Sequence, residues 1–148
     1  MKIIDTNKKA YYDYEITETI EAGIVLEGSE VKSVKLGNAR LRDSFCQLTD
    51  GELYIKNFFI APYDKSGSYT PDPRRNRKLL LHRSEIDKLE GKVRQKGLTI
   101  IPTKLYFVRN RVKIEIALGR GKKLYDKRET ARQKDIKRDV ERQIKENN

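Results

Sequence analysis

The sequence predicts a mainly β protein with short peripheral helices and a basic C-terminal tail, and three observations support this. Runs of alternating apolar and polar residues, typical of half-buried strands, recur along the first 118 residues. Two pairs of such runs are separated by short turn sequences, as in β-hairpins. Residues 119–148 instead carry 11 Lys and Arg and 6 Asp and Glu, with few apolar side chains. We therefore expect a folded domain over residues 1–118 and a tail over residues 119–148.

The strands are predicted from their periodicity. Asp50-Gly51 is a strong hairpin turn between SFCQL and ELYIKNF. A second hairpin joins TIIPTKLYFV to VKIEIAL around RNR, and every second residue of the latter strand is apolar, which indicates one buried face. Near the N-terminus, YDYEITETI has a period of two and predicts a strand with Tyr12, Tyr14 and Ile16 on one face.

Two short helices are expected between the strands. The first is predicted to begin at the N-cap Ser29 and to end at Gly37, with an inward face formed by Val31, Val34 and Leu36. The second is predicted to begin at the N-cap Ser84 and to end at Gly97, with a buried stripe formed by Ile86, Leu89 and Val93. Many short strands with a helix between two hairpins predict a small closed barrel of the OB type.

Composition limits the functions that this chain can have. Charged residues make up 37% of its 148 residues, and the formal net charge of +11 favours polyanionic partners. We expect a cytoplasmic protein with no membrane partner, because no apolar segment is long enough for a membrane span or a signal peptide. Cys46 and His82 are the only residues of their types, which excludes an intrachain disulfide and a Cys/His metal cluster. Without an acid/base pair or a phosphate-binding loop in the sequence, we expect a binding protein with no cofactor, not an enzyme.

Two segments combine cations with tyrosines. Residues 61–73 form a predicted surface loop that leads into four cations in five residues, namely Arg74, Arg75, Arg77 and Lys78. Guanidinium groups bind phosphates and tyrosine rings stack on unpaired bases, so the segment suits RNA; the alternative is a solvated charge run. In NKKAYYDY, Lys8 and Lys9 stand beside three tyrosines, which alternatively pack within a strand. Two such segments and a basic tail together favour RNA.

The tail has too little apolar surface to fold by itself. Its apolar residues Ile136, Val140 and Ile144 recur every four positions, beside a parallel basic row of Lys134, Arg138 and Arg142. We therefore expect a segment that is disordered alone and helical on a partner.

Four motifs in order along the chain resemble those of the SsrA-binding protein family, the bacterial small protein B partners of transfer-messenger RNA. They are NKKA (7–10), EAGIVLEGSEVKS (21–33), DPRRNRKLLLHRSEI (72–86) and GKKLYDKR (121–128). The resemblance covers roughly residues 7 to 140. It implies an OB-type barrel with peripheral helices and a free tail. It also implies that the barrel binds the tRNA-like domain of transfer-messenger RNA and delivers this RNA to stalled ribosomes, and that the tail enters the empty mRNA channel near the decoding centre of the small subunit.

The resemblance also implies site residues. Contacts to transfer-messenger RNA are expected at Asn7, Lys8, Glu21, Lys32, Lys78, Leu79 and Leu80. Contacts of the tail to ribosomal RNA are expected at Lys122, Lys123, Tyr125, Asp126, Lys127 and Arg128. Glu21 could accept hydrogen bonds from base edges or hold a neighbouring lysine, or it could form only a strand-end ion pair. Leu80 could pack beneath a base or fill the core. Phe58 and Phe59 depart from the family, which often has a polar residue there.

Two other functions remain compatible with the residues alone. A ribosomal or initiation-type OB protein would share the basic barrel and tail and would bind ribosomal RNA without transfer-messenger RNA. A nuclease or RNA-modifying enzyme would need a metal site or an acid/base pair. We expect the RNA-binding function, in a monomer.

Overall fold

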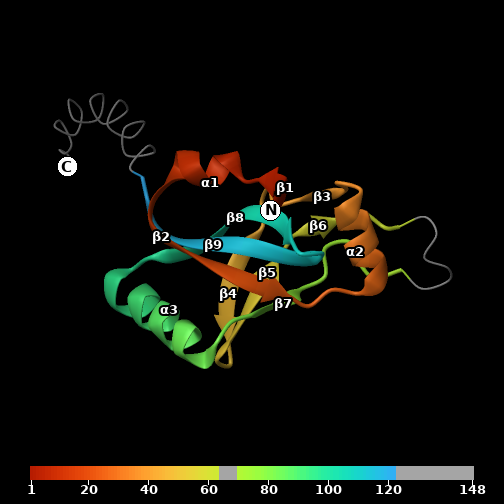
Figure 1. Cartoon of the computed structure of the whole chain (residues 1–148). Helices are drawn as coiled ribbons and strands as arrows, with labels where there is room; N and C mark the ends of the chain where they lie inside the picture. Colours follow the sequence, from red (N-terminus) through yellow and green to blue (C-terminus); the bar gives the residue numbers. More distant parts are fainter. Residues whose placement is uncertain (64–69, 123–148) are drawn as a thin grey trace.

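The structure is a computed structural model that describes residues 1–63 and 70–122. Seven strands form one antiparallel sheet in the order β1-β8-β9-β2-β7-β5-β4, and β3 pairs with β6 in a second, two-stranded sheet. The strands are β1 (Lys2–Thr6), β2 (Tyr14–Ile24), β3 (Ala39–Arg40), β4 (Phe45–Thr49), β5 (Glu52–Lys56), β6 (Phe59–Ile60), β7 (Arg77–Leu80), β8 (Thr99–Val108) and β9 (Arg111–Gly121). The helices α1 (Lys8–Asp13), α2 (Gly28–Lys35) and α3 (Arg83–Lys96) lie around the outside of the sheet (Figure 1).

The mainly β class with peripheral helices is confirmed. The long strands β8, β9 and β2 are consecutive neighbours in the sheet. The last strand in the order, β4, packs against β8, which is second in the order. Within residues 1–63 and 70–122, no hydrogen-bonded ladder joins β4 to β8. The sheet is therefore OB-like, and closure of the barrel stays a prediction.

Both predicted hairpins are present, and each turns through two successive residues of positive φ. Asp50 and Gly51 between β4 and β5 have φ values of 51° and 77°, and Arg109 and Asn110 between β8 and β9 have φ values of 51° and 66°. Two successive positive φ values match the twist of the flanking strands. The apolar positions of β9 from Val112 to Leu118 are all buried, and they join one core with the inner faces of β2, β5 and β8.

The first predicted strand begins too early. Tyr12 is in α1 and is 67% exposed, whereas Tyr14 begins β2 and is half-buried, so the two tyrosines do not share a strand face. Periodicity missed this short helix because six residues are fewer than two helical turns. Residues 2–6, to which the sequence analysis assigned no element, form β1 on the free edge of β8.

Both predicted helices occur, as α2 and α3, but their predicted N-caps are wrong. Helix α2 is capped by Glu27, which exchanges hydrogen bonds with Glu30 in a capping box, and α3 is capped in the same way by His82 with Glu85. Ser29 and Ser84 were expected to be the caps because serine is among the preferred N-cap residues. Val34, Ile86 and Leu89 are buried and Gly97 ends α3 with a φ of 65°, as predicted. Leu36 is 64% exposed, so its predicted inward position is wrong.

The strand β9 continues to Gly121, three residues beyond the predicted domain boundary at residue 118. Gly119, Arg120 and Gly121 pair with the start of β2, and the backbone N–H of Lys122 donates to the carbonyl of Asp13 at 2.9 Å. The division into a folded domain and a tail stays a proposal, with residue 122 as a better boundary because β9 ends at Gly121 and Lys122 is still bonded to Asp13. Residues 123–148 lie outside the described part of the chain.

Candidate RNA-binding surface

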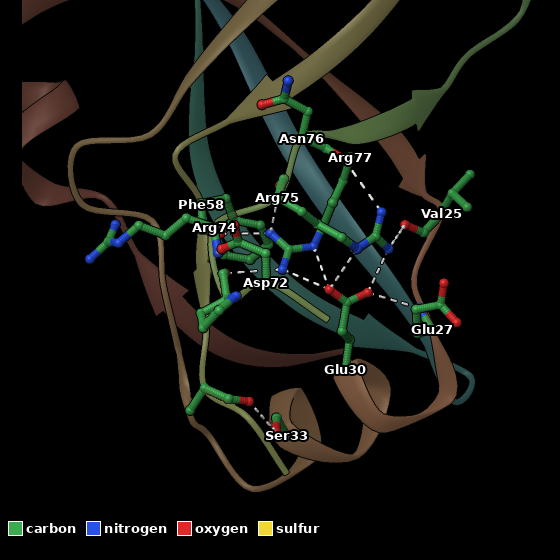
Figure 2. Close-up of polar contacts among 12 residues, drawn as sticks. Val25, Glu27, Glu30, Ser33, Phe58, Asp72, Arg74, Arg75, Asn76 and Arg77 are labelled. Carbon is green, nitrogen blue, oxygen red and sulfur yellow. Dashed lines mark hydrogen bonds and ion pairs between the residues drawn. The ribbon is translucent and has the colours of Figure 1, made fainter. Parts of the chain in front are cut away.

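The cation cluster at residues 74–78 is divided between the interior and the surface. Figure 2 shows Arg75 and Arg77 at the carboxylate of Glu30. Arg77 is 1% exposed, and its Nε and Nη2 donate to the Glu30 carboxylate at 2.9 and 2.7 Å. Arg75 donates to the same carboxylate from Nε at 3.0 Å and from Nη2 at 2.7 Å. Glu30 itself is 4% exposed. One buried carboxylate of α2 therefore binds two guanidinium groups from the segment that leads into β7.

The remaining donors of Arg77 are also satisfied, which matters because an unpaired buried polar group is costly. Its Nη1 donates to the carbonyl of Phe58 at 2.6 Å, and Nη2 donates to that of Pro73 at 3.1 Å. Burial raises the pKa of Glu30, but the hydrogen bonds from Arg75, from the Glu27 backbone and from Arg77 outweigh burial and hold this pKa below its ordinary value. The carboxylate is therefore charged at neutral pH.

This network corrects the predicted role of two cations. Arg75 and Arg77 were expected to engage phosphates or to be solvated, but both bind Glu30, and Arg77 is inaccessible. The guanidinium of Arg74 lies 5.1 Å from the centre of the Phe59 ring on the surface, and Nζ of Lys78 lies 3.5 Å from Glu52 Oε1. Arg77 is therefore out of reach of RNA, whereas the side chains of Arg74 and Lys78 lie at the surface.

The two aromatic residues that depart from the family pattern have different roles. Phe58 is completely buried in the core, with the Arg77 guanidinium 5.4 Å from its ring centre. Phe59 is half-buried in β6, beneath Arg74. Phe58 therefore packs inside, and only Phe59 contributes to the surface.

The residues predicted at the N-terminus lie where β1 leads into α1. The Asn7 side chain is 7% exposed and donates from Nδ2 to the Pro102 carbonyl at 2.9 Å, while its backbone N–H donates to Thr103. Lys8 is exposed, and its side chain makes no hydrogen bond or ion pair among residues 1–63 and 70–122. Asn7 thus anchors this turn to β8, and Lys8 is the neighbouring side chain that is open to a partner.

A second group of predicted residues meets on the outer face of β2. Gly23 of β2 is the ladder partner of Leu80 in β7 and of Lys113 in β9, and Glu21 lies two residues before it on the same face. Leu80 is 50% exposed, which contradicts its alternative role as a core residue. A hollow of about 240 Å³ runs beside Leu80 and Lys113. We call Glu21, Leu80 and Lys113 the β2 surface.

Tyr106 orients Glu21 within the β2 surface. Its hydroxyl donates to Glu21 Oε1 at 2.9 Å, and it is the ladder partner of Lys113. Burial and the hydrogen bond to Glu21 raise the pKa of Tyr106 above its usual range, so the phenol remains a donor at neutral pH. Glu21 makes no ion pair within the described residues, which contradicts the alternative that it forms only a strand-end ion pair. The second carboxylate oxygen is thus available to a donor such as a base amino group.

Leu79 and Lys32 complete the set of described predicted contacts. Leu79 is fully buried, so it supports Leu80 from within the core. Lys32 is exposed on α2, with its Nζ 5.5 Å from the centre of the Tyr63 ring.

Of the predicted tail residues, the structure describes Lys122 alone. Its ammonium donates to the Tyr11 carbonyl at 3.1 Å. Lys123, Tyr125, Asp126, Lys127 and Arg128 lie outside the described residues.

Lys113 and Tyr106 are functional candidates that the sequence analysis did not single out. Lys113 alternates with buried residues of β9, and this alternation predicts its outward position. What the alternation does not reveal is that β9 lies next to β2, and that β2 lies next to β7.

In residues 1–63 and 70–122, no group of three or more His, Cys, Asp or Glu side chains is arranged to hold a metal ion. The Cys46 side chain is half-buried on β4, and burial raises the pKa of its thiol. Helices long and apolar enough to cross a membrane are absent from the part of the chain that the structure describes.

Comparison with known proteins agrees with these features. The family model "SmpB protein" matches residues 4–146. An SsrA-binding protein of Syntrophotalea carbinolica is 54% identical over 146 residues, covering 99% of this chain and 97% of that protein. Another, from Thermoanaerobacter pseudethanolicus, is 55% identical over 146 residues, covering 99% and 94%.

A solved structure is also similar. It is described as "tmRNA-SmpB: a journey to the center of the bacterial ribosome", and one of its chains is 52% identical with a TM-score of 0.66. The match covers 80% of this chain and 84% of that chain. The whole-chain family match, the two close relatives and this shared fold lead to one conclusion: the chain belongs to the SmpB family of SsrA-binding proteins.

Proposed function

We propose that this protein binds the tRNA-like domain of transfer-messenger RNA through the β2 surface and delivers this RNA to stalled ribosomes in trans-translation. The observation that carries the proposal is the β2 surface itself, which places three complementary groups on one face. Glu21 offers a carboxylate oxygen for base amino groups, Leu80 offers exposed apolar area for a base or ribose, and Lys113 offers an ammonium for a phosphate. Family membership supports the same partner.

The predicted contacts then act in two ways. Lys8, Lys32 and Lys78 are exposed or half-buried cations that bind RNA directly. Asn7 and Leu79 have buried side chains and act by holding Lys8 and Leu80 in place. The protein supplies no covalent step in this proposal, since binding and delivery of the RNA are its whole contribution.

Binding measurements with variants of the β2 surface test the proposal. We expect Leu80→Ala and Lys113→Gln to weaken binding to the tRNA-like domain, with Lys113→Gln also lowering the slope of log K against log salt by about 0.7–0.9. Lys88→Gln is the matched control, because Lys88 is an exposed cation of α3 outside the β2 surface. Equal affinity of all three variants would contradict the proposal. Sequencing of the RNA that copurifies with the protein distinguishes this proposal from the ribosomal alternative. The proposal predicts transfer-messenger RNA, and the alternative predicts bulk ribosomal RNA.

The tail is proposed to probe the empty mRNA channel, and its role is separable from binding. Changing Asp126, Lys127 and Arg128 together to alanine should leave affinity for transfer-messenger RNA nearly unchanged and abolish peptide tagging on stalled ribosomes. If Asp126 caps a tail helix, Asp126→Ala should lose about 0.5–2 kcal/mol of ordering and Asp126→Asn should restore tagging. Full tagging by Asp126→Ala would exclude the capping role.

A further inference from the structure

Lys122, at the C-terminal end of the described chain, holds the end of β9 against α1. Its backbone N–H donates to the carbonyl of Asp13 at 2.9 Å, and its ammonium donates to the carbonyl of Tyr11 at 3.1 Å. Both acceptors belong to the last turn of α1, where carbonyls have no partner within the helix. This turn contains no basic residue of its own, so Lys122 also supplies the positive charge that a helix C-terminus favours. We call these two hydrogen bonds the Lys122 anchor.

The end of β9 needs such an anchor because few other contacts hold it. Thr99, the first residue of β8, pairs with Gly119, so beyond Gly119 the strand β9 pairs with β2 alone. Arg120 and Gly121 are exposed and pair there with the first two residues of β2. Figure 1 shows this end of β9 beside the junction of α1 and β2. A two-stranded ribbon is marginally stable in water, so these residues would separate readily from β2 if Lys122 were free.

Helix α1 is itself fixed to the sheet through Tyr11. The hydroxyl of Tyr11 donates to Glu115 Oε2 at 3.3 Å, and Thr103 Oγ1 donates to the same oxygen at 2.7 Å. Glu115 lies in β9 and Thr103 lies in β8, so this carboxylate joins the helix to two long strands. Tyr11 thus has two roles in the anchor, because its hydroxyl fixes α1 and its carbonyl receives Lys122.

The anchor determines the point at which the chain leaves the folded domain. A free chain of three residues reaches up to about 10 Å, so release of residues 120–122 would let the start of the tail move over that distance. A segment tethered to a bound domain acts at an effective concentration that falls as the free tether lengthens. In the proposed function the folded domain binds transfer-messenger RNA while the tail probes the mRNA channel. A fixed starting point therefore favours the second contact.

We propose that Tyr11, Glu115 and Lys122 are positioning residues that hold the start of the tail on α1, and that Lys122 acts as this anchor instead of contacting ribosomal RNA. The inference rests on the proposed function and deepens it, because the anchor connects the RNA-bound domain to the tail. Tyr11 and Glu115 act through Lys122 and touch no RNA in this role.

Amide hydrogen exchange in the free full-length protein tests the anchor without RNA. In Lys122→Met the amide of residue 122 should exchange about 3-fold faster or more, relative to its intrinsic rate, because its bond to Asp13 opens more often. Amides of residues 112–118 should keep their rates, since β9 is paired on both sides there. Lys122→Arg keeps a donor for the Tyr11 carbonyl and should restore the parent rate.

Arg120→Met is the matched control for the exchange measurement. Arg120 is an exposed cation two residues before Lys122, and its side chain makes no hydrogen bond or ion pair within residues 1–63 and 70–122. Its loss removes the same charge from the same end of β9, so it should leave the exchange rate at residue 122 close to that of the parent.

Tyr11→Phe tests the connection to tagging at a position outside the tail. The exchange removes only the hydroxyl that binds Glu115, so the residue 122 amide should exchange about 2-fold faster or more and peptide tagging on stalled ribosomes should fall about 2-fold or more. Affinity for the isolated tRNA-like domain should equal that of the parent. Tyr12→Phe is the matched control, because Tyr12 is 67% exposed and its hydroxyl makes no hydrogen bond within the described residues. Thermal melting of each variant verifies that it is folded.

The outcomes distinguish the anchor from the proposed function. Exchange at residue 122 that is no faster in Lys122→Met than in Arg120→Met overturns the anchor, and so does tagging by Tyr11→Phe that equals tagging by Tyr12→Phe. Weaker binding of Tyr11→Phe to the tRNA-like domain would make Tyr11 an RNA contact and would overturn its positioning role. In each of these cases RNA binding by the β2 surface is unaffected. If the parent protein binds no transfer-messenger RNA, the proposed function fails and the positioning role fails with it.

Discussion

Replacing Glu30 with glutamine should destabilise the protein far more than a typical loss of an ion pair. Within residues 1–63 and 70–122, the exchange removes the only carboxylate that Arg77 binds, and Arg77 is 1% exposed, so a buried guanidinium charge loses its paired anion. Breaking a buried pair from one side costs about 3–5 kcal/mol. Against a typical total stability of about 5–15 kcal/mol, this is a large fraction.

Urea unfolding of the full chain measures the effect. With a typical m-value of about 2 kcal/mol per molar, the midpoint of Glu30→Gln should fall by about 2 M. Glu18→Gln is the matched control, because Lys92 and Glu18 are 2.6 Å apart but 36% and 41% exposed, and such pairs contribute about 0–1 kcal/mol. The double variant Glu30→Gln/Arg77→Met should lose less than the sum of the two single losses.

A loss below about 1 kcal/mol for Glu30→Gln would refute this reasoning, as would strict additivity in the double variant. Either result would mean that water reaches Arg77, or that its bonds to the carbonyls of Phe58 and Pro73 suffice to hold it.

Three further predictions concern the pKa of Glu30, the hydroxyl of Tyr106 and the space around Gly119. The pKa of Glu30 is lower in the folded protein than its unfolded value of about 4.5, so the charged carboxylate stabilises the fold above pH 4.5. This stability is lost as the pH falls through the folded pKa. The urea midpoint should therefore drop more steeply below pH 4.5 in the parent protein than in Glu30→Gln. Tyr106→Phe should lower RNA affinity, because Glu21 loses its 2.9 Å donor, while the salt slope of binding stays unchanged; a changed slope would indicate a different role. Gly119→Ala should lower the thermal midpoint, because a Cβ there would lie 3.0 Å from Ile101 Cδ1 and 3.3 Å from a backbone oxygen, and an unchanged midpoint would show that the β2–β9 contact adjusts freely.

The elements that could be predicted from the sequence are those defined by local signals. The two hairpins follow from Asp50-Gly51 and from alternation in β9, and the end of α3 follows from Gly97. Helix α1 was missed because it is too short to show a helical period. The caps were missed because glutamate and histidine replace the usual serine and threonine.

The site could be predicted less completely, because its chemistry depends on which strands are neighbours. The role of Arg77 is set by Glu30, which lies 47 residues earlier, and no local pattern connects them. As long as the internal partners of its side chains are unknown, a run of cations is interpreted as a solvated or nucleic-acid-binding segment. The resemblance to the family placed Glu21 and Leu80 in the site, but Lys113 needed the strand order.

The buried pair of Glu30 and Arg77 also has a consequence for strand register. Strand β7 has four residues and forms two residue pairs with each neighbour, Gly23 and Ile24 on one side and Tyr54 and Ile55 on the other. So short a ladder specifies alignment weakly, and a slip by one residue would move every side chain to the opposite face. Such a slip would carry Arg77 out of reach of Glu30, and Leu80 would turn inward from the β2 surface. A contact made inside the protein thus selects the one alignment of β7 in which Leu80 lies on the proposed RNA-binding surface.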